Sequence, residues 1–341
     1  MSIAPALELD ATNPTLILRQ QDVRRVLRMT DCISAVEQAF VSHAKGETVG
    51  PGVLGIHVTG GGFHVKAAGI ATGDRPPMFV AKINANFPGN PARHALPTIQ
   101  GVLGLFDGSN GRLLALIDSG ELTSIRTAAA TAVAAKYCAP EFGDVVICGC
   151  GEQSRHQLRA VACVRSLQRV RAFDIDRARA MRFAADIRRE LDVDTSVIDD
   201  LSEALDATIW ITCTTARRWF LGRRHVRRGA FVAAVGADNP EKQELEPALL
   251  AENVLIADVL DQSATIGELH HAIETGAMRR EDARGELADV VSGRIRGRIS
   301  DDEIIIFDST GTALEDVAAA TVVYDHAFAR GDCLALTMSD A

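Results

Sequence analysis

The sequence lacks the features that would assign the protein to a membrane, an oxidising compartment or a nucleic acid. No apolar run reaches the roughly 18 residues that a membrane-spanning helix needs, and the N-terminus has no charged-then-apolar signal pattern. The seven cysteines are an odd number and have neither disulfide nor zinc spacing. A net charge of −9 argues against nucleic acid as the main partner. We therefore expect a cytoplasmic protein that binds no metal, membrane or nucleic acid.

What the sequence does contain is a regular alternation of strand-like and helix-like segments after residue 144. Seven apolar, strand-like runs alternate there with helical patterns, which predicts a parallel sheet covered by helices on both faces. One of these helices is expected at residues 177–191, with Met181, Ala184 and Ile187 on its buried face.

The N-terminal part of the chain has a different pattern, which predicts a mainly antiparallel sheet with one helix. Thr30 or Asp31 could cap that helix. Asp-Gly and Asn-Gly pairs within residues 107–111 lie between two apolar runs and predict a β-hairpin.

The division into domains follows from these two patterns. A last helix near residues 313–328 should return to the N-terminal domain, because the parallel-sheet domain is complete before it. We therefore expect an α/β chain in which residues 1–126 and 312–341 form an α+β domain, with a parallel-sheet domain of residues 127–311 between them.

Residues 145–154 carry the most informative motif. An apolar run ends at Gly149 and Gly151, a helix-like segment follows, and the next strand-like run ends at Asp174. This is the layout of the first βαβ unit of a dinucleotide-binding fold, with Ser154 in place of the usual third glycine. Gly149 would allow the tight turn, and Gly151 would let the backbone approach a pyrophosphate. Asp174 could accept hydrogen bonds from the adenine ribose, which favours NAD over NADP, or it could cap the next helix.

Five further side chains are candidates for chemistry. Lys82 shares one side of a predicted strand with apolar neighbours, and Lys66 has a similar setting after His64. Together with Arg126, the two lysines could hold an anionic substrate, although each alone could be structural. Asp238 follows a buried strand and is a candidate acid or base at the sheet edge where ligands bind, or a plain turn residue.

The remaining strand ends leave alternatives open. Ser309 could meet the nicotinamide or the substrate, or it could cap the last helix. Lys242 and Glu244 could form a local ion pair. The adjacent histidines His270 and His271 would point about 100° apart on a helix, which favours a surface or packing role over a metal site.

Five stretches, in order along nearly the whole chain, resemble the ornithine cyclodeaminase/mu-crystallin family: residues 82–90, 122–129, 148–153, 235–245 and 307–316. The resemblance implies a homodimer, an N-terminal substrate-binding and dimerisation domain completed by the C-terminal helix, and an NAD-binding Rossmann domain between them. The cofactor-binding residues that we then expect are Gly149, Gly151, Glu152, Gln153, Ser154, Asp174, Thr212 and Ser309.

The resemblance also implies roles for three side chains. By position, Lys82 contacts the substrate carboxylate and helps catalysis, Arg126 binds that carboxylate near the cofactor, and Asp238 is the general base that holds the substrate amine. Members of the mu-crystallin type tend not to keep this aspartate, so its presence favours amino-acid chemistry. His64 and Lys66 depart from the usual family residues and are expected to change the side-chain or anion specificity.

The predicted function is NAD-dependent hydride transfer at the α-carbon of an amino acid. In the cyclodeaminase version, ornithine becomes proline and ammonia with no net change in NADH. The alternatives are an amino-acid dehydrogenase or a reductase of cyclic imines, both with net cofactor turnover (NADP not excluded), and a nucleotide-dependent binding protein without turnover. The enzyme alternatives differ in absorbance at 340 nm.

Overall fold

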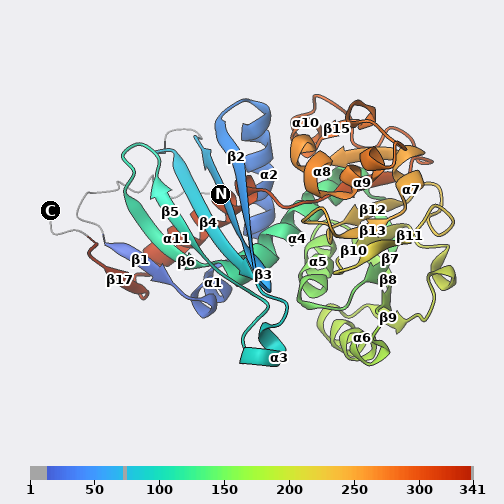
Figure 1. Cartoon of the computed structure of the whole chain (residues 1–341), viewed down its shortest axis with the longest axis horizontal. Helices are drawn as coiled ribbons and strands as arrows, with labels where there is room; N and C mark the ends of the chain where they lie inside the picture. Colours follow the sequence, from blue (N-terminus) through green and yellow to red (C-terminus); the bar gives the residue numbers. More distant parts are fainter. Residues whose placement is uncertain (1–13, 72–74, 339–341) are drawn as a thin grey trace. The chain divides into compact units, whose positions relative to one another are not determined.

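The computed structural model describes residues 14–71 and 75–338, so the N-terminal segment examined for a signal pattern lies mostly outside the described residues. The chain divides into two compact units, residues 1–126 with 312–341 and residues 127–311. Each unit is built around its own sheet (Figure 1).

The first unit contains a seven-stranded sheet of order β17-β1-β6-β5-β4-β3-β2. Strands β2 to β6 pair with their sequence neighbours in antiparallel fashion, and β1 pairs parallel to β6. The hairpin predicted at residues 107–111 connects β5 and β6 and is confirmed. The strands are β1 (Thr15–Leu18), β2 (Thr48–Val58), β3 (Gly61–Ile70), β4 (Met78–Asn86), β5 (Ile99–Asp107), β6 (Leu113–Asp118) and β17 (Leu334–Leu336).

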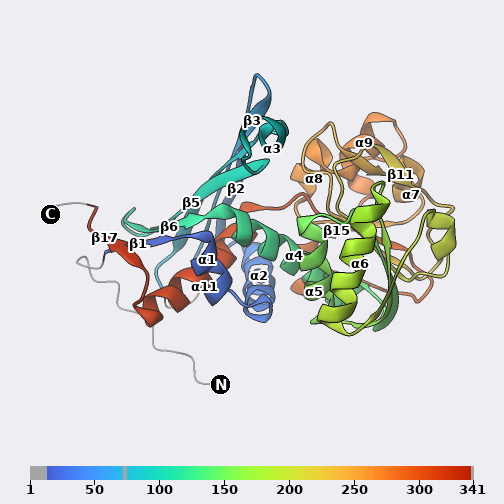
Figure 2. The ribbon, with the colours of Figure 1, turned by 90° about the horizontal axis from the view of Figure 1, so that it is seen from below.

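The helices of this unit pack on one face of the sheet, as Figure 2 shows for α1 (Gln20–Val26), α2 (Met29–Ala44) and α11 (Ala313–Arg330). Helix α11 contacts α2 and strands β2 to β6, so the last helix of the chain completes the N-terminal unit. A short helix, α3 (Asn90–His94), precedes β5.

The predicted cap of α2 is wrong. The helix begins at Met29 with Arg28 as its N-cap residue, so Thr30 and Asp31 lie inside the first turn. Asp31 instead accepts two hydrogen bonds from the Arg28 guanidinium, at 2.7 and 3.0 Å. A carboxylate in the first turn also interacts favourably with the positive end of the helix, which gives Asp31 a role without capping.

The opposite face of the sheet carries no helix among the described residues. Cross-strand register places Leu54, Ile83 and Val102 in one row of this face, and Ile56 and Phe63 in the next row. These five side chains are 38 to 56% exposed. A sheet face of this kind, open and apolar, is typical of an interaction surface.

The second unit contains an eight-stranded, all-parallel sheet of order β15-β14-β16-β12-β10-β7-β8-β9. From β9 to β12 this is the order 3-2-1-4-5 of a dinucleotide-binding Rossmann fold, and β16, the last of these strands in the chain, lies between β12 and β14; the predicted parallel sheet is confirmed. The strands are β7 (Phe142–Cys148), β8 (Ser166–Phe173), β9 (Asp194–Val197), β10 (Ile209–Thr212), β12 (Phe231–Ala234), β14 (Val254–Ala257), β15 (Gly285–Glu286) and β16 (Ile305–Asp308).

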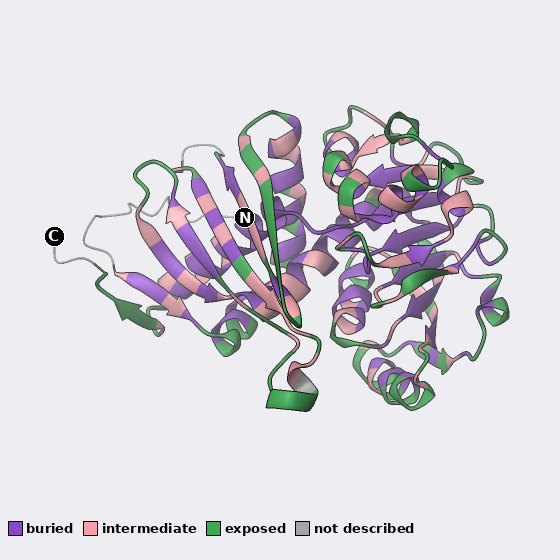
Figure 3. Cartoon of the chain, viewed as in Figure 1, coloured by how far each residue is buried: buried purple, intermediate pink, exposed green. Residues whose placement is uncertain are grey.

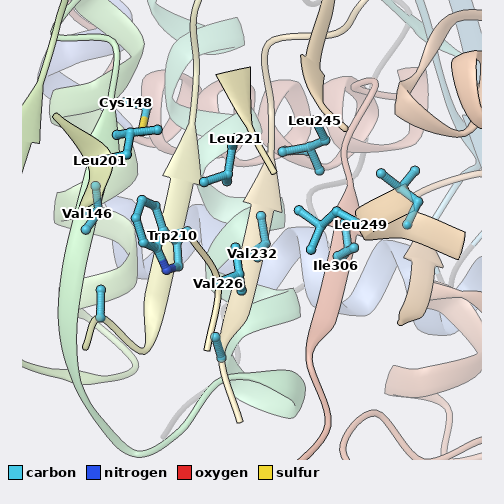
Figure 4. Close-up of a cluster of buried hydrophobic side chains, with 14 of the residues drawn as sticks. Val146, Cys148, Leu201, Trp210, Leu221, Val226, Val232, Leu245, Leu249 and Ile306 are labelled. Atoms are coloured by element: carbon cyan, nitrogen blue, oxygen red, sulfur yellow. The ribbon is translucent and has the colours of Figure 1, made fainter. Parts of the chain in front are cut away.

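The centre of the sheet forms because β10, β12 and β16 are short, mainly apolar runs in which every residue is buried (Figure 3). On one face, Trp210 lies opposite Val146 and Val232 in the parallel register, at the centre of a cluster of buried side chains (Figure 4). The covering helices are α5 (Glu152–Ala162), α6 (Arg177–Leu191), α7 (Pro247–Ala251), α8 (Leu260–Ile266), α9 (Glu268–Glu274) and α10 (Leu287–Val291).

Two details of this unit differ from the predictions. Helix α6 has the predicted bounds, but Met181 is 57% exposed, and the buried face contains Ala180, Phe183, Ala184 and Ile187. The rotation of α6 about its axis turns the large Phe183 side chain toward the sheet, because burying Phe183 removes more apolar area from water than burying Met181 would. A separate two-stranded sheet of β11 (Arg217–Leu221) and β13 (Gln243–Leu245) was not predicted.

Helix α4 (Ser119–Cys138) contains the boundary between the units. Its alanine-rich sequence favours a helix, because alanine has the highest helix propensity. No helix of the described chain is long and apolar enough to cross a lipid bilayer.

Candidate functional site

The glycine turn after β7 has the geometry of a phosphate-binding turn. Gly149 has φ +90°, and a Cβ there would lie 2.8 Å from Thr214 Cγ2 and 2.9 Å from the Cys213 carbonyl oxygen, so only glycine fits. Helix α5 follows with Gly151 as its N-cap, and a Cβ on Gly151 would meet nothing within 4 Å. The start of the helix therefore presents bare backbone to open space, where N–H groups can bind an anion.

The residues after this turn have distinct roles. Ser154, in the place of the third glycine, is buried and its hydroxyl donates to the Gly151 carbonyl oxygen at 2.5 Å, which braces the turn. Glu152 is exposed, with a carboxylate oxygen 3.7 Å from His156 Nε2. Gln153 is half-buried in the first turn of α5.

Asp174 follows β8 and is bonded to the glycine turn. Its buried carboxylate accepts hydrogen bonds from the backbone N–H groups of Cys150 and Asp176, each at 2.8 Å. The alternative that Asp174 caps α6 is wrong, because the N-cap is Asp176, whose side chain accepts from the Arg179 N–H. A carboxylate held against this turn lies where it could accept hydrogen bonds from the hydroxyls of an adenine ribose.

The predicted ion pair between Lys242 and Glu244 is wrong. Glu244 does not pair with Lys242. Its fully buried carboxylate accepts from Thr212 Oγ1 at 2.7 Å and from two backbone N–H groups. Lys242 instead forms an ion pair with Asp238 at 2.7 Å, and Asp238 is 46% exposed. Because the side chain of Glu244 points into the protein, Lys242 pairs with the exposed acid Asp238 instead.

Ser309 follows β16 at the carboxyl edge of the parallel sheet. Its side chain is 2% exposed, and its hydroxyl has no hydrogen-bond partner in the part of the chain that the structure describes. The alternative that Ser309 caps the last helix is wrong, because Thr312 is the N-cap of α11 and accepts from the Leu314 N–H at 3.1 Å. A buried, unpartnered hydroxyl at this edge fits a ligand that brings its own polar group.

Two buried acids at the same edge, Asp258 and Asp308, were not predicted. Asp258 accepts from the N–H groups of Thr310 and Gly311, each at 2.7 Å, and Asp308 accepts from those of Glu268 and Leu269 at 3.1 and 3.0 Å. Burial raises the pKa of each aspartate to about 6, although these N–H donors act in the opposite direction. An acid at the end of each buried strand was a visible signal: Asp258 directly follows β14, and Asp308 is the last residue of β16.

In the first unit, Lys82 and Arg126 meet two acids of α11. Lys82 Nζ lies 2.7 Å from one oxygen of Asp316 and 2.8 Å from the other. Arg126 Nε donates to Asp316 at 2.8 Å, and its Nη1 donates to Glu315 at 2.7 Å. All four side chains are at most 4% exposed. The two cations therefore form a buried network with two carboxylates of the same chain.

Glu315 and Asp316 were not predicted, although both lie in the family-like stretch 307–316. The local signal was a capping box, in which Thr312 caps α11 and Glu315 reaches back to the cap backbone. Nothing local indicated that Asp316 would meet a lysine 234 positions earlier in the chain.

The network shifts the protonation of Lys82. Burial, followed by the charge of Arg126, lowers the pKa of Lys82 to about 7, while Asp316 acts in the opposite direction. Burial also favours the neutral form of Asp316, but Arg126 and Lys82 outweigh it and hold the pKa of this carboxyl below its ordinary value. Lys82 can thus exchange a proton near neutral pH, which an ordinary lysine cannot.

The two remaining predicted residues lie on the same sheet face as Lys82. Lys66 on β3 is directly opposite Lys82 on β4, and His64 is opposite Asn84. Cross-strand partners project to the same face. Both side chains are half-buried, and the charge of Lys66 contributes to lowering the pKa of Lys82. The first unit therefore joins Lys82 and Arg126 through Asp316 and places Lys66 and His64 on the sheet face of Lys82.

Comparisons with known proteins agree over most of the chain. The sequence signature of the ornithine cyclodeaminase/mu-crystallin family matches residues 13–331. The alanine dehydrogenase of Archaeoglobus fulgidus is 34% identical over 319 residues, which cover 93% of this chain and 96% of the relative. The iminosuccinate reductase of Paracoccus denitrificans is 32% identical over 325 residues, which cover 93% and 98%.

Solved structures extend the similarity. An archaeal alanine dehydrogenase dimer with bound NAD superposes with a TM-score of 0.89 at 32% identity, covering 95% of this chain and 99% of that one. The Thermococcus litoralis Δ1-pyrroline-2-carboxylate reductase, in complex with NADH and L-proline, has a TM-score of 0.89 at 26% identity and 94% and 99% coverage. A lysine cyclodeaminase has a TM-score of 0.83 at 27% identity, covering 96% of each chain.

Proposed function

The chain belongs to the ornithine cyclodeaminase/mu-crystallin family, and from this premise we propose that it is an NAD-dependent oxidoreductase acting at the α-carbon of an amino acid or its α-imine. The observation that carries this proposal is Lys82, a buried lysine with a pKa of about 7 on the same sheet face as other cations. Such a group suits a reaction that couples hydride transfer to proton transfer.

The residues of the second unit fit a nicotinamide dinucleotide. The bare backbone at Gly151 suits the pyrophosphate, and the Asp174 carboxylate suits the adenine ribose of NAD rather than the 2′-phosphate of NADP. The unpartnered hydroxyl of Ser309 suits the carboxamide or ribose of the nicotinamide half. When bound, the cofactor supplies or accepts the hydride at the α-carbon.

The residues of the first unit supply charge and a proton. Arg126 remains a cation, because its two carboxylate partners outweigh the effect of burial and hold its pKa above the ordinary value. It therefore provides a fixed positive charge for a substrate carboxylate. Lys82 provides or accepts one proton, so that imine, NADH and a proton give the amino acid and NAD. Asp238, exposed beside Lys242, is the proposed base for the substrate amine.

Net reduction of an imine, or the reverse oxidation, is the first candidate, because the relatives include an alanine dehydrogenase and imine reductases. Redox-neutral cyclodeamination is the second candidate. The presence of Asp238 and the similarity to a lysine cyclodeaminase favour it. Net reduction or oxidation changes the NADH concentration, whereas cyclodeamination leaves it unchanged.

The test is a substrate screen with two simultaneous readouts. Purified protein is mixed with NADH and cyclic or acyclic α-imino acids, and separately with NAD and alanine, proline, ornithine or lysine. Absorbance at 340 nm reports net cofactor turnover, and a coupled assay reports ammonia. Falling or rising absorbance supports the reductase or dehydrogenase, and ammonia release at constant absorbance supports the cyclodeaminase. NADH binding without turnover of any compound would indicate a nucleotide-dependent binding protein instead.

The glycine turn gives a matched pair of variants. Gly149→Ala should lower both the thermal stability and the NADH affinity, because the left-handed backbone and the contact with Cys213 leave no room for a Cβ. Gly151→Ala should leave the melting temperature unchanged, since its Cβ meets open space, yet weaken NADH binding by about tenfold or more if a pyrophosphate approaches there. Fluorescence titration with NADH measures the affinity; unaltered binding by Gly151→Ala would exclude this cofactor position.

We also propose that the protein is a homodimer through the open apolar face of the first unit, since a similar alanine dehydrogenase is a dimer. The double variant Leu54→Glu/Ile83→Glu places charges on two residues that are 56% and 46% exposed, so the fold should persist while the assembly becomes monomeric. Met181→Glu, on exposed α6, is the control. Light scattering after gel filtration gives the mass, and a double variant that remains dimeric would assign the interface elsewhere.

A further inference from the structure

Glu244 occupies an unusual place in the second unit. It belongs to the three-residue strand β13 of the small second sheet, yet its fully buried carboxylate reaches the ends of two strands of the main sheet. One oxygen accepts from Thr212 Oγ1 at 2.7 Å and from the Gly236 N–H at 2.8 Å, and the other accepts from the Thr214 N–H at 2.6 Å. A single side chain thus holds the segment after β10 and the segment after β12.

The two segments that Glu244 holds lead to the residues of the candidate site. Thr214 lies against the glycine turn, because a Cβ on Gly149 would be 2.8 Å from Thr214 Cγ2. Gly236 lies two residues before Asp238, the proposed base. A Cβ on Gly236 would be 2.3 Å from the carboxyl carbon of Glu244, so this position is glycine because the carboxylate fills the space.

Glu244 is itself fixed from behind. Glu268 on α9 accepts from the backbone N–H groups of Glu244 and Leu245, at 2.7 and 3.1 Å. Glu244 has no cation partner within the described ranges, and burial raises its pKa while its hydrogen-bond donors oppose the shift. A buried acid without a counter-ion is unfavourable for folding, and an apolar side chain would be a less costly way to fill the site. Because a buried acid at this position lowers the stability of the fold, Glu244 should have a role other than filling space.

We propose that Glu244 is a positioning residue, which sets the placement of the Thr214 segment against the glycine turn and of the Gly236–Asp238 segment beside it. It touches neither cofactor nor substrate and acts through Thr212, Thr214 and Gly236. The inference rests on the proposed function, because its consequences are read in cofactor binding and turnover. It also gives Thr212 a different role from direct cofactor binding, since its hydroxyl is directed to Glu244.

The experiment compares Glu244→Gln with Glu252→Gln, a control that removes an exposed acid paired with Arg223. A glutamine keeps the shape but presents an amide group to at least one of the three donors. We expect Glu244→Gln to raise the dissociation constant for NADH about tenfold and to lower kcat by up to about a hundredfold, because small misplacements at a site have effects of this size. These are measured well below the melting temperature, and the control should match the wild type.

The outcomes separate the inference from the function on which it rests. A wild-type protein that neither binds NADH nor turns over any imino acid overturns both. A competent wild type with a Glu244→Gln variant of equal NADH affinity and kcat overturns the positioning role alone, even if the variant melts earlier. If Glu244→Gln does not fold, Thr212→Val decides, because it removes one donor while keeping the shape. This variant should then show the same changes in smaller degree, and wild-type values would contradict the inference.

Discussion

Replacing Asp316 by alanine is expected to lower the free energy of unfolding by about 3–5 kcal/mol, the usual effect of leaving buried charges without their partner. Asp316 is the carboxylate that Lys82 and Arg126 share, at 2.7 and 2.8 Å. Without it Arg126 keeps Glu315, but Lys82 loses both carboxylate contacts. Arg126 therefore stays balanced by Glu315, and the variant must either bury Lys82 as a cation without a counter-ion or remove its proton.

The loss should depend on pH with a defined sign. Asp316 raises the pKa of Lys82 toward its present value of about 7, so removing the carboxylate lowers that pKa further. At pH 9 Lys82 is neutral in the folded wild type as well as in the variant, so its protonation adds nothing to the difference between them. At pH 6 the wild type holds a paired cation, whereas the variant must bury an unpaired cation or release a proton that the unfolded chain keeps, so the loss should be larger at pH 6 than at pH 9. Urea unfolding at both pH values measures the difference. Asp332→Ala, an exposed control, should change stability by less than about 0.5 kcal/mol. A loss below about 1 kcal/mol for Asp316→Ala would mean that the network is not buried as described.

Lys82→Met is expected to lower kcat for imine reduction by about 10²–10⁴-fold, the range for loss of a general acid. In the wild type, kcat/KM for reduction should fall as pH rises through about 7, because Lys82 must carry the proton that it donates. In the oxidative direction the dependence should reverse, since the neutral amine then accepts the proton. In the Lys82→Met variant, this change of kcat/KM near pH 7 should be absent in both directions.

Lys66→Met provides the internal control for this assignment. The charge of Lys66 contributes to lowering the pKa of Lys82. Removing that charge should therefore move the pH-dependent change in kcat/KM to higher pH without abolishing it. Rate profiles from pH 5.5 to 9 with the wild type and both variants test the set. If the rate of Lys82→Met still changed with pH near 7, the titrating group would be a residue other than Lys82.

The features that the sequence predicted are those that depend on local pattern. The glycine turn at 149–151, the bounds of α6 and the alternating parallel strands follow from apolar runs, glycines and helical periodicity over short windows. The resemblance to a family added roles for the candidates Lys82, Arg126 and Asp238, and the structure shows the first two in one buried network.

The features that the sequence did not predict depend on contacts between distant segments or on very short elements. Asp316 lies 234 positions from Lys82, and no local rule pairs them. Strands β13 and β15 have three and two residues, too few to show a period. Lys242 has two acids within reach along the chain, and the choice of Asp238 depends on Glu244 turning inward to Thr212.

The central claim is that this chain transfers hydride between NADH and the α-carbon of an imino acid. Incubation with NADH carrying deuterium at both hydrogen positions of nicotinamide C4, together with Δ1-pyrroline-2-carboxylate and the other α-imino acids of the screen, tests it directly by mass spectrometry of the products. We predict one deuterium at the α-carbon of the product amino acid, with an equal amount of NAD formed. Products without deuterium, or NADH that remains unoxidised with every compound, would contradict the account.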